Sequence, residues 1–227
     1  MDDLQAHVTR KPMKVLGYGN VRGVDMDRFS RRQEIEEQAR NIRKENLFTF
    51  VFVGRIVGDK GINELIEAFV LLHKKYNDIR LLLIGNFEDE LDPLKTETKE
   101  KITESPFIEY LGPKYDDDLI SHYAASDCFV FPSYREGFPN TVMEAGAMGL
   151  PSIVTDINGS REIIENGVNG LIVPSKDMIS LFEAMEKVVL DKEQTTLMAS
   201  NSRKMIETRF ERSFVQKCLY DFYNEIM

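Results

Sequence analysis

The 227-residue sequence has two cysteines, three histidines and no tryptophan. Cys128 and Cys218 provide neither a disulfide framework nor a CxxC metal pair, which is typical of a reducing compartment. The histidines are scattered without His-x-x-x-His spacing, so the sequence offers no zinc site. Because Cys128 lies in the apolar segment DCFVFPS, we expect a buried core thiol there rather than a nucleophile.

Long apolar segments and an excess of positive charge are absent as well. No run approaches the roughly 18 residues of a membrane span, and the N-terminal MDDLQAHVTRK lacks the apolar core of a signal peptide. Residues 1–45 carry ten Lys and Arg against eight Asp and Glu, whereas residues 46–227 carry nineteen against thirty. Because of this excess of acidic side chains, residues 46–227 are a poor electrostatic partner for nucleic acid. We therefore expect a cytoplasmic protein that does not bind nucleic acid.

From residue 47 onward, short apolar runs alternate with amphipathic or charged segments. The runs predict strands over residues 47–54, 79–85, 107–112, 127–133, 151–156 and 169–174. Helices are predicted over residues 61–76, 89–102, 116–126, 141–149, 160–167, 176–191, 193–208 and 211–226. This alternation predicts an α/β fold with a Rossmann-like, doubly wound parallel sheet, in which ligands bind beyond the carboxyl ends of the strands.

The N-terminal segment differs from this pattern. KVLGYGNVRGVDMDRF predicts one short strand at 14–17, followed by glycines, and a charged helix is expected at 31–45. We therefore divide the chain into a hinge segment with the first strand (1–46), a Rossmann-like domain (47–190) and C-terminal helices that pack on it (191–227).

Two cations follow the first long strand in the segment VGRIVGDKG. Arg55 comes directly after the strand, and Lys60 precedes the next helix in a loop with Gly58 and Gly61. Such glycines let backbone N–H groups converge on an anion, while Arg supplies a fork of donors and Lys a point charge. Two solvated loop charges are the alternative. The position at the carboxyl end of a strand in an acidic body favours a phosphate site, although the segment is not a Walker A loop.

The stretch YREGFPNTVMEAGAMGLP is the most specific in the chain. Glu136 follows a strand in a Gly-Phe-Pro-Asn turn, and Glu144 lies eight residues further on, in the next helix. Pro139 has no N–H, so the donors to an anion in this turn come from Gly137, Phe138, Asn140 and Thr141. Glu136 has no evident structural role and suits sugar hydroxyls. For Glu144 two roles stay open, a ribose acceptor and the last residue of a capping box that begins at Thr141.

These motifs, continued by DINGSREIIENGVNGLIVP, resemble the C-terminal nucleotide-sugar-binding domain of the group 1 (family 4) retaining glycosyltransferases. Two glutamates with seven residues between them are that family's most specific mark. GYGNVRGVDMDRF and EGFPNTVMEA resemble its bacterial capsular and cell-surface polysaccharide branch. The resemblance covers roughly residues 14–190. Pro139 departs from it, because many members have glycine there.

The resemblance implies the C-terminal half of a GT-B enzyme, in which two Rossmann-like domains enclose the active site. Such an enzyme transfers a hexosyl group with retention from a nucleotide sugar, here expected to be UDP-linked, to a saccharide or lipid-linked acceptor. The acceptor would bind through an N-terminal domain that this chain lacks, so we expect the chain alone to be inactive. The full-length protein would be cytoplasmic and peripheral at the inner membrane face.

The resemblance also implies the roles of individual residues. Arg55 and Lys60 would bind the diphosphate and assist its departure, so no metal or other cofactor is expected. Glu136 would contact the donor sugar and Glu144 the ribose, while Lys114 would lie near the base. The residues expected around the sugar and the distal phosphate, through backbone groups, are Gly137, Phe138, Asn140 and Thr141.

Two other classes share parts of this pattern. A sugar-nucleotide epimerase of similar shape would also bind UDP, but the Glu136 and Glu144 pair argues against it. A non-catalytic nucleotide-binding module, or a receiver domain, is the second alternative. A receiver needs an acidic cluster after its early strands, where this chain has Gly54 and Arg55.

Overall fold

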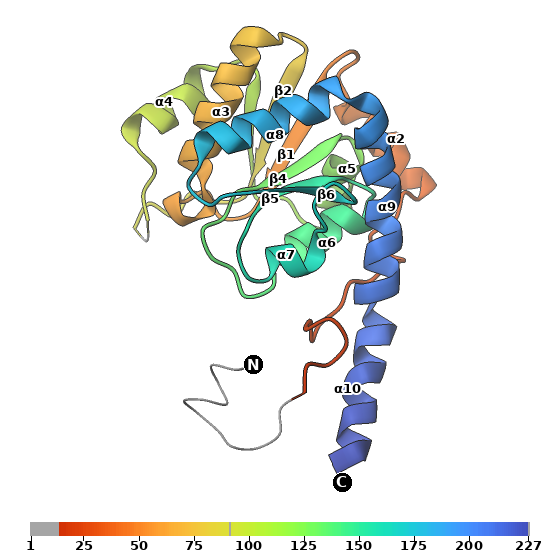
Figure 1. The fold of residues 1–227 in the computed structure, drawn as a ribbon. Coiled ribbons are helices and arrows are strands. Elements are labelled where there is room, and N and C mark those ends of the chain that lie inside the picture. Colours follow the sequence, from red (N-terminus) through yellow and green to blue (C-terminus); the bar gives the residue numbers. More distant parts are fainter. Residues whose placement is uncertain (1–13, 91, 227) are drawn as a thin grey trace.

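Six parallel strands form one sheet, in the order β3-β2-β1-β4-β5-β6. The computed structural model describes residues 14–90 and 92–226 (Figure 1). The strands are β1 (Phe48–Val53), β2 (Ile79–Ile84), β3 (Ile108–Gly112), β4 (Cys128–Phe131), β5 (Ser152–Thr155) and β6 (Gly170–Val173). The predicted Rossmann-like parallel α/β fold is confirmed.

Helices cover both faces of the sheet. They are α2 (Gln33–Ile42), α3 (Ile62–Lys75), α4 (Thr96–Glu104), α5 (Asp116–Ala124), α6 (Asn140–Ala147), α7 (Ser160–Ile163), α8 (Met178–Leu190), α9 (Lys192–Phe210) and α10 (Arg212–Ile226), with a short 3₁₀ helix η1 (Gly58–Lys60). On one face α3 packs against α4 and α8, and on the other α2 packs against α5 and α6 against α9 (Figure 1). Within the described residues, no helix combines the length and the apolar character needed to cross a membrane.

The strand order reverses beside β1. The chain runs from β1 outward to β2 and β3, and then returns to place β4 on the other side of β1, where Phe50 pairs with Cys128 and Val51 with Phe129. The loops that leave β1 and β4 therefore begin side by side at the carboxyl edge of the sheet. In open parallel sheets this switch point is where ligands bind.

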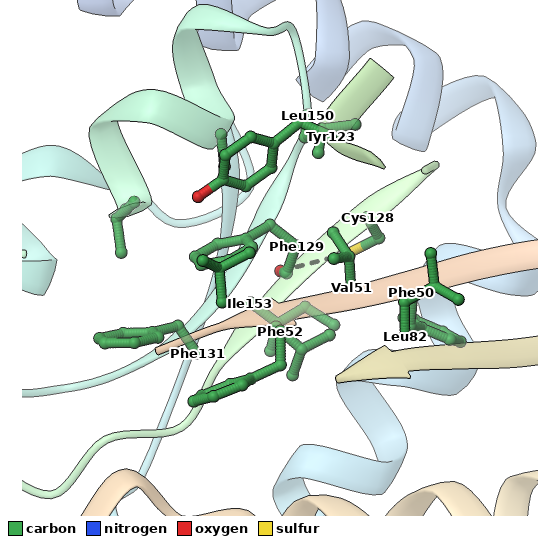
Figure 2. Close-up of a cluster of buried hydrophobic side chains, with 14 of the residues drawn as sticks. Phe50, Val51, Phe52, Leu82, Tyr123, Cys128, Phe129, Phe131, Leu150 and Ile153 are labelled. Atoms are coloured by element: carbon green, nitrogen blue, oxygen red, sulfur yellow. Dashed lines mark hydrogen bonds between the residues drawn. The ribbon is translucent and has the colours of Figure 1, made fainter. Parts of the chain in front are cut away.

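Aromatic side chains hold the two central strands together (Figure 2). Phe52 of β1 stacks on Phe131 of β4, with 5.7 Å between ring centroids, and Phe131 lies 5.8 Å from Phe129. Tyr123 of α5 packs edge-on against Phe129 at 6.0 Å. Cys128 of β4 is fully buried, and its burial raises the pKa of the thiol above the ordinary range. The predicted core thiol is confirmed.

Residues 14–17 do not form the predicted strand. They lie against α10, where a Cβ atom on Gly17 would stand 3.5 Å from the sulfur of Cys218, and Lys14 pairs with Glu225 at 2.8 Å. A strand needs a neighbouring strand for its backbone groups, and here the neighbour is a helix. The prediction fails for that reason.

The predicted helix over 89–102 also needs correction, because α4 begins only at Thr96. Pro93 has no N–H for the carbonyl four residues earlier and so interrupts a helix that begins at residue 89. The Asp92 carboxylate also accepts a hydrogen bond from the backbone N–H of Asp59 at 2.5 Å. Residues 92–95 are thus part of a loop that supports the β1–α3 connection. Similarly, α7 is shorter than predicted and ends at Ile163.

Candidate functional site

Lys60 and Glu136 form an ion pair beyond the carboxyl ends of β1 and β4. Their charged atoms lie 2.5 Å apart, and the two side chains are 11% and 16% exposed. The Ser133 hydroxyl donates a second hydrogen bond to the same carboxylate at 2.8 Å. Residues 76 positions apart in the sequence thus meet because β4 lies beside β1.

Close backbone packing fixes the loop that presents Lys60. Gly61 has φ +69°, and a Cβ atom added there would lie 2.2 Å from the carbonyl oxygen of Pro132. Only glycine fits this position, since the left-handed conformation and the clash both exclude a side chain. The backbone N–H of Tyr134 also donates to the carbonyl of Asp59 at 2.8 Å. These contacts hold the β1–α3 and β4–α6 loops together.

Several backbone N–H groups of the β1–α3 loop, including those of both glycines, already have partners inside the protein. Gly58 donates to the Asp92 carbonyl at 3.1 Å, Asp59 to the Asp92 carboxylate at 2.5 Å, and Gly61 to the Gly58 carbonyl at 2.9 Å. The expectation that the glycines of this loop offer N–H groups to an anion is therefore wrong for this structure. The side chains of Arg55 and Lys60 are therefore the groups of this loop that we expect to meet a phosphate.

Arg55 lies apart from the Lys60–Glu136 pair. Its guanidinium group turns toward the segment after β2 and pairs with Glu88 at 3.1 Å, with the two side chains 45% and 33% exposed. An exposed pair of this kind contributes little to stability, so Arg55 can exchange Glu88 for a phosphate at low cost. The structure thus brings Lys60 and Glu136 together and holds Arg55 on the other side of β1.

Glu144 is on the second turn of α6 and lines a different space. From the described part of the chain its carboxylate receives one long hydrogen bond, donated by the Tyr123 hydroxyl at 3.5 Å. Burial raises the pKa of Glu144, and the Tyr123 bond and the positive charges of Arg28 and Arg22 offset only part of this effect. Glu144 is therefore a largely buried acceptor with few partners of its own.

The capping-box alternative for Glu144 is wrong. Helix α6 begins at Asn140 with Pro139 in the N-cap position, so Thr141 is already the second helical residue. Glu144 is then the fifth residue of the helix, beyond the third position that a capping box uses. Its carboxylate is directed to Tyr123 instead.

We call the space beside Glu144 the Glu144 cavity; its volume is about 330 Å³. It is lined by Arg22, Gly23, Val24, Asp25, Arg28, Phe29, Tyr115, Asp116, Leu119, Asn140, Glu144 and Arg212. Half of these residues come from the N-terminal segment that the sequence marks only as a hinge. The glycines and the asparagine in GYGNVRG, which suggest a tight and specific turn, were the available signal.

The turn after Glu136 offers backbone rather than side-chain groups. No side chain caps α6, so the N–H groups of Asn140 and Thr141 at its start are not bonded within the helix. The Phe138 ring packs edge-on against Phe210, 5.5 Å between centroids, and so stabilises the turn. Gly137 lies in the same turn, with space around its Cα atom.

Glu136 also lines a second space of about 320 Å³, formed with residues that follow β4 and β5. The other lining residues are Tyr134, Arg135, Asp156, Ile157, Asn158 and Arg161. Lys114 lines neither space and pairs with Asp118 at 3.0 Å. The proposed contact of Lys114 with a base stays a prediction.

Within residues 14–90 and 92–226, no group of three or more His, Cys, Asp and Glu side chains is placed to hold a metal ion. The expectation that phosphate charge is met by Arg55 and Lys60 without a metal stays a prediction.

Comparison with known proteins supplies the family. Residues 33–205 match the family described as glycosyl transferases group 1. The chain belongs to this family. It is 33% identical over 214 residues to the capsular polysaccharide biosynthesis glycosyltransferase CapM of Staphylococcus aureus, covering 94% of this chain and 55% of CapM. The group 1 glycosyltransferases thus include this chain, as the resemblance implied.

Other relatives extend the comparison. An Escherichia coli UDP-Gal:alpha-D-GlcNAc-diphosphoundecaprenol alpha-1,3-galactosyltransferase is 29% identical, covering 88% of this chain and 51% of the relative. The crystal structure of the C-terminal domain of a group 1 glycosyl transferase, LpcC of Francisella tularensis, matches with a TM-score of 0.72 and 25% identity, covering 83% of this chain and 99% of that one. The Anabaena protein Alr3699/HepE, solved with UDP, shares the fold with a TM-score of 0.80 at 22% identity, covering 89% of this chain and 56% of that one. The chain thus spans about half the length of the curated relatives.

Proposed function

We propose that this chain is the donor-binding half of a retaining hexosyltransferase that uses a UDP-linked sugar. The observation that carries the proposal is the meeting of Lys60 and Glu136 at the switch point of the sheet. Lys60 and Arg55 provide positive charge for the diphosphate from either side of β1, and Glu136, beside Lys60, provides an acceptor for sugar hydroxyls. The N–H groups at the start of α6 suit the distal phosphate or the sugar, since a helix N-terminus favours negative charge.

Lys60 has a second part in this proposal. Its charge is paired with Glu136, so a bound diphosphate would share Lys60 with that carboxylate or displace it. The leaving nucleoside diphosphate gains negative charge as the bond to the sugar breaks. Lys60 and Arg55 would stabilise this charge, which is the contribution that lowers the barrier. No metal is required in this scheme.

The relatives support the choice of substrates. The E. coli relative carries UDP-Gal and a diphosphoundecaprenol acceptor in its name, and a Campylobacter jejuni relative is named as an N-acetylgalactosaminyltransferase that acts on a diphospho-undecaprenol acceptor. We therefore infer a UDP-linked hexose or N-acetylhexosamine as donor and a saccharide or lipid-linked acceptor in cell-surface polysaccharide synthesis. Lipid-linked acceptors would place the enzyme at the inner face of the membrane.

The acceptor side of the site is proposed to lie in the half of the relatives' length that this chain does not span. The 227-residue chain should accordingly bind the donor without transferring its sugar. No observation favours the epimerase or the receiver alternative over this function.

Isothermal titration calorimetry with UDP, uridine and a UDP-sugar tests the proposal. We expect UDP to bind the chain and uridine to bind much more weakly, because the cations meet the diphosphate. Glu136→Gln should remove the additional affinity of the UDP-sugar over UDP. Absence of UDP binding, or turnover of a UDP-sugar into a glycosylated acceptor by this chain alone, would contradict the corresponding part of the proposal.

A further inference from the structure

Three guanidinium groups line the Glu144 cavity, and two of them are paired with carboxylates in its wall. Arg28 pairs with Asp116 at 2.7 Å, and Arg212 pairs with Asp25 at 3.2 Å. For Arg22, the third, no carboxylate partner occurs among the residues that the structure describes. Its side chain is exposed, and within residues 14–90 and 92–226 no acceptor occupies its donors, so a ligand can reach them.

A specific turn presents Arg22 at this place. The buried Asn20 side chain accepts hydrogen bonds from the backbone N–H groups of Arg22 at 2.8 Å and of Gly23 at 2.5 Å. Gly23 has φ +67°, and a Cβ atom there would lie 2.6 Å from the Cα atom of Arg212. The N–H of Arg212 donates in turn to the carbonyl of Val24 at 2.9 Å. The turn is therefore fixed to the junction of α9 and α10 and is not a loose hinge at this point.

The cavity thus contains one group with open donors and one with open acceptors. Glu144 can only accept hydrogen bonds when ionised, and Arg22 can only donate them. A hydroxyl group does both, so a pair of neighbouring hydroxyls satisfies the carboxylate and the guanidinium group at once. Burial of Glu144 further favours a ligand with hydroxyl groups, because their hydrogen bonds replace those to the water that the carboxylate has lost.

We propose that Arg22 binds the ribose hydroxyls of the donor nucleotide together with Glu144. The inference rests on the proposed function and extends it to the N-terminal segment, which would form part of the nucleotide site. Hydrogen bonds from a charged group are among the stronger ones, so the loss of Arg22 should weaken UDP binding about tenfold.

Titration of UDP and 2′,3′-dideoxy-UDP into wild type and Arg22→Ala tests this inference. We expect Arg22→Ala to weaken UDP about tenfold and to leave the affinity for the dideoxy nucleotide unchanged, because that ligand has no hydroxyls to lose. Arg22→Lys should lie between the two proteins for UDP. The matched control is Arg40→Ala, which removes the same charge from α2 beside a different cavity and should behave as wild type with both ligands. Melting temperatures should be unchanged, since Arg22 is exposed.

Each other outcome is decisive. Equal losses for UDP and the dideoxy nucleotide would place Arg22 on the phosphates or in the fold and overturn the ribose assignment. Unchanged UDP affinity in Arg22→Ala would overturn the inference and leave the proposed function standing. A wild-type chain that does not bind UDP would overturn both.

Discussion

The two glutamates of the candidate site are eight residues apart and have opposite surroundings. Glu136 meets Lys60 at 2.5 Å and the Ser133 hydroxyl at 2.8 Å, so its charge is balanced inside the protein. Among the residues that the structure describes, Glu144 receives a hydrogen bond only from the Tyr123 hydroxyl, at 3.5 Å, and burial raises its pKa. The Glu136 carboxylate is thus already stabilised by partners within the protein, and a bound ligand has to replace some of these contacts. The Glu144 carboxylate is destabilised by burial, and hydrogen bonds from the hydroxyl groups of a ligand would stabilise it.

The largest effect on stability should come from removing one partner of the Lys60–Glu136 ion pair. Lys60→Met leaves the mostly buried Glu136 without a counter-charge, and loss of one partner of a buried pair costs about 3 kcal/mol. We expect this decrease in the free energy of unfolding, measured with urea, and at least about tenfold weaker UDP binding. The double variant Lys60→Met/Glu136→Gln should recover most of the stability and none of the UDP affinity. Wild-type stability in Lys60→Met would show that the pair is not energetically coupled.

Substitution of Arg55 should weaken UDP binding with little change in the free energy of unfolding. Because the Arg55–Glu88 pair is exposed, Arg55→Ala should change the free energy of unfolding by less than about 0.5 kcal/mol. UDP affinity should nevertheless fall about tenfold, and the weak binding of uridine should not change. Glu88→Gln is the matched control, which frees Arg55 and should not weaken UDP. A loss of uridine binding equal to that of UDP would place Arg55 away from the phosphates.

Glu144→Gln should show opposite effects on stability and binding. Burial disfavours the ionised form of Glu144 and raises its pKa, so with respect to this group the folded protein is most stable at pH values below the ordinary pKa of 4.5. This contribution is lost as pH rises through the raised folded value. The variant should therefore be more stable than wild type at pH 7.5 by about 1 kcal/mol, or about 2–4 °C in melting temperature. The difference should disappear at pH 4.

The same substitution should weaken UDP and reduce the penalty for removing its 2′-hydroxyl. Calorimetry with UDP and 2′-deoxy-UDP measures this penalty in both proteins. An equal penalty in wild type and Glu144→Gln would mean that Glu144 does not contact the ribose.

The smallest effect is expected for Tyr123→Phe. The removed hydroxyl makes a hydrogen bond of 3.5 Å to Glu144, while the ring stays packed on Phe129. We expect a loss of less than about 1 kcal/mol in the free energy of unfolding. The pKa of Glu144 should rise further, because the Tyr123 bond lowers it. A loss above about 2 kcal/mol would show that Glu144 is better satisfied than this distance indicates.

Local patterns were sufficient for most of the fold. The run FTFVFV has no polar face, as a strand buried on both sides requires, and it forms β1 with nearly every residue buried. Two of the predictions failed at segments that contact a distant part of the chain. Asp92 holds residues near Pro93 in a loop, and the segment 14–17 lies beside α10 rather than beside a strand.

By itself the sequence determined the alternation of strands and helices and placed Arg55, Lys60 and Glu136 just after strands, because these properties depend on residues a few positions apart. Only the tertiary structure decided which of these side chains meet. Lys60 reaches Glu136 because β4 returns beside β1. The Gly58 N–H, expected from the sequence to bind an anion, instead donates to the carbonyl of Asp92 from the next loop. Tertiary contacts also bring Arg22 to the Glu144 cavity. Its turn is fixed by the α9–α10 junction, far along the chain, and no local spacing in the sequence encodes that contact.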